Sequence, residues 1–165
     1  MKFSMEPPRL SDSAIGAIIN GVINGAIAWA AFKTSESIPL SMDSIAAPGV
    51  TALGNAATVA FALTLIMTCI TFFMVRRSAR KSGVAPASFQ QIAFLPTGLR
   101  IALSNTLLAF GAFVASAVLW QRFIGTLMVA PLVATMVVAA VAAGATAFAE
   151  WRTKREMLVE SAQAC

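Results

Sequence analysis

Five uncharged polar side chains stand inside long apolar segments of this sequence, and they are its candidate functional residues. They are Asn20, Asn24, Asn55, Asn105 and Ser116. A side-chain amide offers donors and an acceptor oxygen, and a hydroxyl offers one donor and two lone pairs. Such groups can line a path for a polar solute, or they can join neighbouring helices through hydrogen bonds. Both interpretations stay open, because a buried amide needs partners of either kind.

The segment INGVINGAIAW, residues 19–29, places two of these amides one helical turn apart. At about 100° per residue, Asn20 and Asn24 fall on one face of a helix, opposite large aliphatic side chains. Gly21 and Gly25 stand beside them as a small-xxx-small pair, a common motif that permits close helix contact in a bilayer. We therefore expect the two amides to face protein near the middle of the membrane.

Two further apolar segments carry polar side chains of the same kind. Asn105 and Ser116 share one predicted helix face with three alanines, whereas leucines and valines occupy the opposite face. Asn55 lies near the outer end of another segment. The threonines within residues 64–71 of that segment are interpreted as neutral, because a threonine hydroxyl can bond the carbonyl one turn earlier.

The sequence lacks the residues that most enzymes and metal sites use. It contains no histidine, and its four apolar segments contain no Asp, Glu, Lys or Arg. Histidine is the usual acid or base near neutral pH and a common metal ligand, and proton-coupled transporters usually place an ionisable group within the membrane. We therefore expect neither an enzyme nor a proton-coupled transporter, and no cofactor or metal. Cys69 and Cys165 are too few for a disulfide framework.

The elements that position the candidate residues are membrane spans. Of the 165 residues, 58% are hydrophobic and 12% are charged, whereas soluble domains average about 25% charged. A helix needs about 20 apolar residues to cross the hydrocarbon core, and four segments satisfy this length: residues 14–32, 52–75, 101–120 and 131–149. We predict an all-α membrane protein, with residues 1–165 as a single domain of four transmembrane helices in an up-down bundle.

Basic residues set the predicted orientation, because Lys and Arg near the spans stay on the cytoplasmic side. Of the 12 basic residues, only Lys33 and Arg122 fall in the two loops on the opposite side. The densest basic group lies in the middle loop, at Arg76, Arg77, Arg80 and Lys81. We predict a multi-pass protein of a bacterial inner membrane with both termini in the cytoplasm. The basic loop is interpreted as a topology signal, not as a nucleic-acid site.

The outer loops leave two alternatives open. The backbone of the apolar turn of residues 121–131 needs hydrogen-bond partners if it dips into lipid. A re-entrant segment and an early start of the fourth helix both fit this turn. Arg122 within it is either an interfacial anchor that extends to the headgroups or an outer gate. The other outer loop, residues 33–47, holds an apolar stretch that can fold back onto the bundle.

The stretches INGVINGAIAW and VLWQRFIGTLMVAPL resemble those of short four-helix bacterial inner-membrane proteins that are often labelled permeases. The resemblance covers the chain from Ser11 onward, and it implies a four-span architecture without assigning functional residues. The size and layout also resemble the small multidrug-resistance exporters, which depend on a carboxylate in the first span. Because Asn20 and Asn24 stand in the middle of that span here, this second likeness extends to architecture only.

Two functional classes remain. A permease-like transporter or channel-like module would use the asparagines to line the interior of the bundle, with a substrate that the sequence does not identify. A non-transporting scaffold or accessory subunit would instead pack against another membrane protein. In either class, small helix faces left outside the bundle predict a homo-oligomer or a membrane-protein partner. Ala140 and Gly144 in the fourth span are the expected outward contact.

Overall fold

The computed structural model describes residues 10–42, 50–82 and 94–163, which form four long helices and two short strands. The long helices are α1 (Ala14–Phe32), α2 (Ala52–Ser82), α4 (Leu99–Phe123) and α5 (Pro131–Gln163). A 3₁₀ turn, η1 (Leu10–Ser13), precedes α1, and a π-helical turn, η2 (Phe94–Gly98), leads into α4. All four helices are long and apolar enough to cross a membrane. This confirms the predicted all-α fold with four span-length helices and is consistent with a multi-pass membrane protein.

Three predicted helix starts, at Ala14, Ala52 and Pro131, agree with the structure. A proline suits the first turn of a helix, where its missing N–H leaves no bond unmade. α2 and α5 continue beyond the predicted spans to Ser82 and Gln163. The Arg, Lys, Glu and Met residues of these extensions are good helix formers, so the end of an apolar span does not end the helix. The basic N-terminal tail and Cys165 lie outside the described residues.

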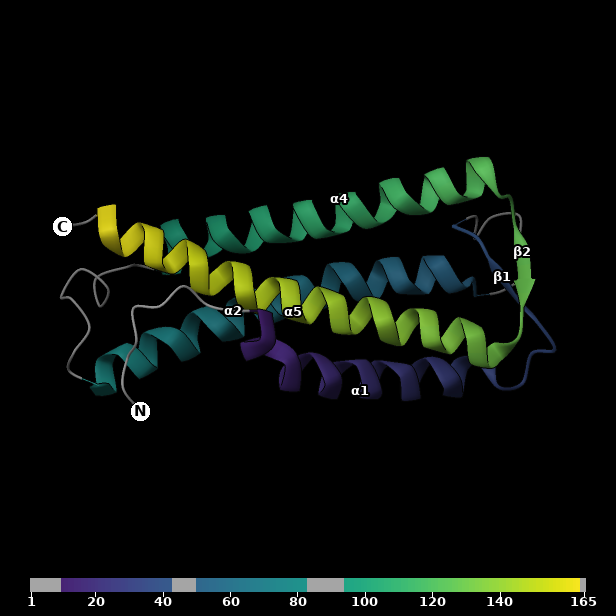
Figure 1. The fold of residues 1–165 in the computed structure, drawn as a ribbon, viewed down its shortest axis with the longest axis horizontal. Coiled ribbons are helices and arrows are strands. Elements are labelled where there is room, and N and C mark those ends of the chain that lie inside the picture. Colours follow the sequence, from purple (N-terminus) through teal and green to yellow (C-terminus); the bar gives the residue numbers. More distant parts are fainter. Residues whose placement is uncertain (1–9, 43–49, 83–93, 164–165) are drawn as a thin grey trace.

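Successive long helices run in opposite directions, and α5 crosses between α1 and α4 (Figure 1). α5 packs mainly on α1 and α2, whereas α4 packs mainly on α2 and touches α5 more sparsely. The start of α1 and the end of α5 lie toward the same end of the bundle, and the two strands lie at the other end (Figure 1). We call these the helix-terminus end and the strand end.

The packing of α1 on α5 depends on glycine. The buried residues of α1 are Ala17, Gly21, Gly25, Ala28 and Phe32. A Cβ at Gly21 would lie 3.1 Å from the Ala139 carbonyl oxygen, and a Cβ at Gly25 would lie 3.1 Å from the Ala139 Cβ. Lipid is as apolar as the helices, so close backbone approach is a main source of helix association in a bilayer. Gly21 and Gly25 therefore lie at the centre of the contact between α1 and α5, whereas the sequence suggested that they flank a contact made by Asn20 and Asn24.

A two-stranded antiparallel sheet closes the strand end. β1 (Ile38–Leu40), which follows α1, pairs with β2 (Leu127–Val129), which precedes α5. Gly125 has a φ of 90° and turns the chain from α4 toward β2, a conformation that glycine adopts readily. The turn of residues 121–131 is therefore not an early start of the fourth helix, because α5 begins at Pro131 and the backbone of Leu127–Val129 pairs with the folded-back loop after α1.

Candidate functional site

The interior of the bundle holds two apolar clusters separated by polar side chains. One cluster lies at the strand end and includes Phe32 and Val138. The other, toward the helix-terminus end, consists of Phe72, Ala79, Ile101 and Met157. Along α2, α4 and α5, seven buried polar residues lie between the two clusters in sequence. These residues, which we call the polar layer, are Thr64, Thr68, Thr71, Asn105, Thr106, Thr146 and Thr153.

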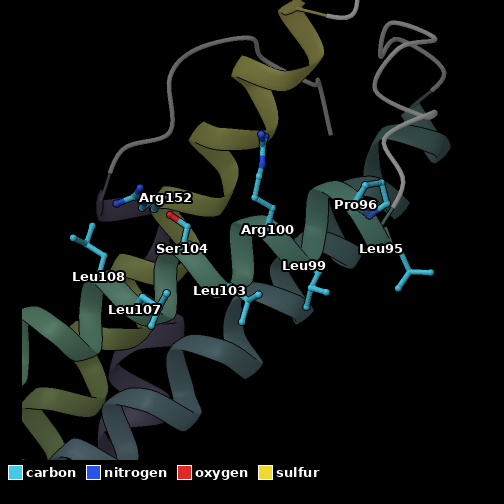
Figure 2. Close-up of a pocket in the computed structure, with 9 residues that line it drawn as sticks. All are labelled: Leu95, Pro96, Leu99, Arg100, Leu103, Ser104, Leu107, Leu108 and Arg152. Atoms are coloured by element: carbon cyan, nitrogen blue, oxygen red, sulfur yellow. The ribbon is translucent and has the colours of Figure 1, made fainter.

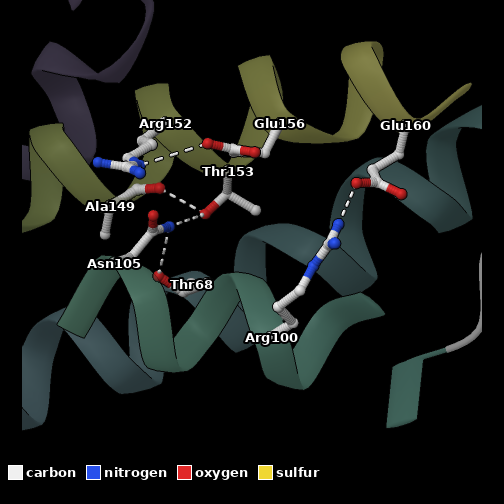
Figure 3. Close-up of polar contacts among 8 residues, drawn as sticks. All are labelled: Thr68, Arg100, Asn105, Ala149, Arg152, Thr153, Glu156 and Glu160. Carbon is white, nitrogen blue, oxygen red and sulfur yellow. Dashed lines mark hydrogen bonds and ion pairs between the residues drawn. The ribbon is translucent and has the colours of Figure 1, made fainter. Parts of the chain in front are cut away.

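Asn105 is the centre of the polar layer (Figure 3). It is only 1% exposed. Its amide nitrogen donates to Thr68 Oγ1 at 3.3 Å and to Thr153 Oγ1 at 3.2 Å. The Thr153 hydroxyl in turn donates to the Ala149 carbonyl at 2.6 Å. One side chain of α4 therefore bonds both α2 and α5, although α4 and α5 share few other contacts.

The polar layer also contains buried atoms that have no hydrogen-bond partner among the described residues. They are Asn105 Oδ1, Thr106 Oγ1 and Thr146 Oγ1. Leaving a buried polar group unpaired costs about 1–3 kcal/mol, and buried polar groups in native proteins usually have a protein or water partner. Asn105 therefore bonds three helices together and also presents an unused acceptor inside the bundle.

The threonines of the polar layer form contacts between helices that the sequence does not predict. Thr64 donates to the Ala60 carbonyl at 2.7 Å, which is the local bond that favours a neutral interpretation. A threonine bonded in this way can still accept, and Thr153 does so from Asn105. Thr153 lies beyond residue 149, the predicted end of the fourth span. Its contact could not be expected from the spans alone, because it depends on the extension of α5 as a helix.

Asn20 and Asn24 are half-buried at the edge of the contact between α1 and α5. The Asn24 amide nitrogen donates to the Asn20 backbone carbonyl at 2.9 Å, within its own helix. The Asn20 amide nitrogen lies 3.6 Å from the Met67 sulfur of α2. Each asparagine precedes a glycine of the contact by one residue, which rotates it about 100° from the centre. The structure does not bring either amide into a hydrogen bond with Asn105.

Asn55 and Ser116 lie away from the polar layer. Asn55 is half-buried near the start of α2, where its backbone N–H donates to the Thr51 carbonyl at 3.0 Å. Ser116 is exposed, and its hydroxyl donates to the Ala112 carbonyl at 2.8 Å. An ideal helix puts Ser116 on the same face as Asn105. Neighbouring helices therefore cover that face of α4 at Asn105 and leave it exposed at Ser116.

The basic residues that predict the orientation are separated in space from Arg122. Arg77, Arg80 and Lys81 are exposed at the end of α2, and Arg76 is half-buried there. Arg122 is exposed in the last turn of α4, close to the strand end. Within the described part of the chain, Arg122 forms no ion pair.

Ion pairs occur where α5 leaves its apolar part. They are Arg100–Glu160, Arg152–Glu156 and Lys154–Glu150. The nitrogen–oxygen distance is 3.5 Å in the second pair and 3.6 Å in the third. Of these three pairs, the pair of Arg100 with Glu160 joins two helices, α4 and α5, and the other two lie within α5 (Figure 3). Such partly exposed pairs contribute about 0–1 kcal/mol each to stability.

Among the residues that the structure describes, no three His, Cys, Asp or Glu side chains converge as metal ligands would. No protein-family model, curated protein or solved structure matches this sequence. Asn105 and its two threonine partners form the candidate site, because they are a buried side-chain hydrogen-bond network that joins three helices.

Proposed function

We propose that this chain crosses a bacterial inner membrane four times, with both termini in the cytoplasm. The start of α1 and the end of α5 lie toward the helix-terminus end of the bundle (Figure 1). The basic residues at the end of α2 and in the last part of α5 lie there as well. Because Lys and Arg near the spans favour the cytoplasmic side, this end is assigned to the cytoplasm and the strand end to the periplasm.

Cysteine labelling tests this orientation. In a background with Cys69→Ala and Cys165→Ala, Arg122→Cys is expected to react with a membrane-impermeant maleimide in intact cells. Lys81→Cys is expected to react only after the membrane is permeabilised. Both positions are exposed at opposite ends of the bundle, so the reverse pattern would contradict the assignment.

Within this orientation, we propose a permease-like function, in which a small polar solute or ion passes through the polar layer. The observation that supports it is the unpartnered Asn105 Oδ1, which lies beside two threonine hydroxyls between apolar clusters. Polar residues within membrane segments commonly mark solute pathways, because unpaired polar groups are costly there. A solute that donates a hydrogen bond to this oxygen would remove that cost.

Transport requires the bundle to open on each side of the polar layer. The apolar clusters that flank the layer close it in this structure. α4 is the helix whose movement would cost the fewest contacts, because it is held mainly by α2. In this proposal α4 moves relative to α5, and the hydrogen bond of Asn105 to Thr153 breaks as the path opens.

Solute flux into liposomes tests the proposal. Reconstituted protein is challenged with glycerol, urea or potassium chloride, and the recovery of vesicle volume is followed by light scattering. At least one probe is expected to enter faster than in empty liposomes, and Asn105→Leu is expected to abolish the difference. Ser116→Ala is the matched control on the same helix and should retain it. No excess flux of any probe, with insertion verified, would reject the transport proposal for these solutes.

A non-transporting accessory subunit is the second candidate, and the outer surface of α5 favours it. Ala140 and Gly144 are exposed, and a Cβ at Gly144 would meet nothing within 4 Å. Small exposed residues on a membrane helix permit another helix to approach closely. A partner that copurifies with the wild-type protein and is lost from Gly144→Leu, together with absent flux, would support this candidate.

A further inference from the structure

A groove of about 840 Å³ runs along the first half of α4 on the outside of the bundle (Figure 2). Its wall is mainly leucine, and the residues that form it are Leu95, Leu99, Leu103, Leu107 and Leu108. All five leucines are exposed. In a membrane Leu103, Leu107 and Leu108 face lipid within the predicted span of residues 101–120, and Leu95 and Leu99 precede that span.

The same groove is bordered by two arginines and a serine. Arg100 and Ser104 come from α4, and Arg152 comes from α5 (Figure 2). Arg100, Ser104 and Arg152 line the same groove, so α4 and α5 together form its polar rim. Arginine, with its planar array of donors, is well suited to bind phosphate oxygens.

Each arginine contacts one carboxylate and keeps further N–H donors unengaged by that contact. Arg100 contacts Glu160 through Nη2, and Arg152 contacts Glu156 through Nε at 3.5 Å. The Arg152 guanidinium also lies 5.8 Å from the centre of the Phe148 ring. A guanidinium carries five N–H donors, so both side chains retain donors for a further anion.

The depth of the rim matches the headgroup level of the membrane. The apolar part of α5 ends at Ala149, and Arg152 follows three residues later, about 4.5 Å along the axis. Because Asn105 bonds Thr153, Arg152 lies at about the level of Ser104 and Leu108 on α4. Leu107 and Leu108 therefore lie on the strand-end side of Arg100, and Leu95 lies on its helix-terminus side. In the proposed orientation the rim faces the cytoplasmic leaflet, which is rich in anionic lipids, and basic pockets between helices on that side bind such headgroups.

We propose that this groove binds one anionic phospholipid of the inner leaflet. Its phosphate contacts Arg100, Arg152 and the Ser104 hydroxyl, and one acyl chain passes Leu107 and Leu108 toward the strand end. The proposal rests on the orientation given above and not on transport. A bound lipid would bridge α4 and α5 where the two helices share few direct contacts, and it would therefore stabilise their relative position.

Lipid binding is tested by native mass spectrometry of the detergent-solubilised protein with phosphatidylglycerol or phosphatidylcholine of equal chain length. Wild type is expected to retain phosphatidylglycerol preferentially. The variant Arg100→Gln with Arg152→Gln is expected to bind it about 25-fold more weakly, which corresponds to about fivefold for each basic residue near an anionic surface. The control, Arg77→Gln with Arg80→Gln, removes two exposed arginines from the same end of the bundle and should change binding less than twofold.

A second variant keeps the test decisive if the first fails to fold. Glu156→Gln with Glu160→Gln frees both arginines from their carboxylates, so it is expected to bind phosphatidylglycerol several-fold more tightly than wild type. Equal retention of the two lipids by wild type, an equal loss in the Arg77 and Arg80 control, or no gain in the glutamate variant would each overturn the proposal.

Discussion

The hydrogen bonds of Asn105 should be measurable as a coupling between helices. Asn105→Leu removes the donated bonds while keeping the branching and the number of side-chain heavy atoms, and Thr153→Val removes the acceptor with nearly the same shape. Interhelical hydrogen bonds in membrane proteins average about 0.6 kcal/mol and reach about 1.7 kcal/mol. With the amide nitrogen 3.2 Å from Thr153 Oγ1 and both residues buried, we expect a coupling of about 1 kcal/mol within that range.

The single substitution alone is less informative. Asn105→Leu loses two bonds, worth about 1–3 kcal/mol together, but it also removes the unpartnered Oδ1. Relief of that burial recovers about 1–3 kcal/mol, so the net change in the free energy of unfolding is expected to be small. A double-mutant cycle cancels such one-residue terms and leaves the pairwise coupling.

The assay is reversible unfolding in mixed micelles with increasing dodecyl sulfate, followed by tryptophan fluorescence. Asn24→Leu combined with Thr153→Val is the control cycle, because the Asn24 amide bonds the Asn20 carbonyl in its own helix. That control should show no coupling beyond about 0.3–0.5 kcal/mol, the usual scatter for independent sites. If the Asn105 cycle gives the same value as the control, the description of Asn105 as a link between α4 and α5 is wrong.

Two further substitutions test the packing, and one tests the role of Arg122 near the strand end. Gly21→Leu should destabilise the fold by about 1–3 kcal/mol through overpacking, since even a Cβ added at Gly21 would lie 3.2 Å from the Ala143 Cβ. The control is Ala26→Leu at an exposed position of α1, which should change thermal stability in detergent little. Gly144→Leu, which faces open space, should leave thermal stability unchanged but dissociate an oligomer detected by native mass spectrometry. Arg122→Gln should leave liposome flux unchanged if this residue is only an anchor, whereas reduced flux at equal expression would assign it to a gate.

The membrane spans could be predicted closely because their determinants are local. Runs of apolar residues without charge define them, and Pro131 marks a helix start by its own geometry. The extents of α2 and α5 could not be predicted from hydropathy, because the residues after the spans are polar and also good helix formers. The small sheet was missed because β2 is an apolar stretch whose pairing with β1 joins distant parts of the chain.

The candidate residues were identified by type, but their relations depend on packing. Asn105 was one of five candidate polar residues that the sequence did not rank. Of these five, Asn105 is the one that the structure places in the polar layer. Asn20 and Asn24 formed the more conspicuous pattern, yet the neighbouring glycines occupy the centre of the contact. A shift of one residue on a helix rotates a side chain by about 100°, so an idealised wheel cannot decide between adjacent positions.

Access of water to the polar layer tests the central claim, that solute passes at Asn105, most directly. In the protein with Cys69→Ala and Cys165→Ala, a single cysteine at Thr68 or at Asn105 is treated with a small charged thiosulfonate in reconstituted liposomes. Ala17→Cys, on the buried face of α1 and outside both apolar clusters, is the control. Thr68 and Asn105 are closed in this structure, so a path that opens predicts modification of either cysteine much faster than of the control. Modification as slow as at Ala17 for both would contradict a solute path through the polar layer.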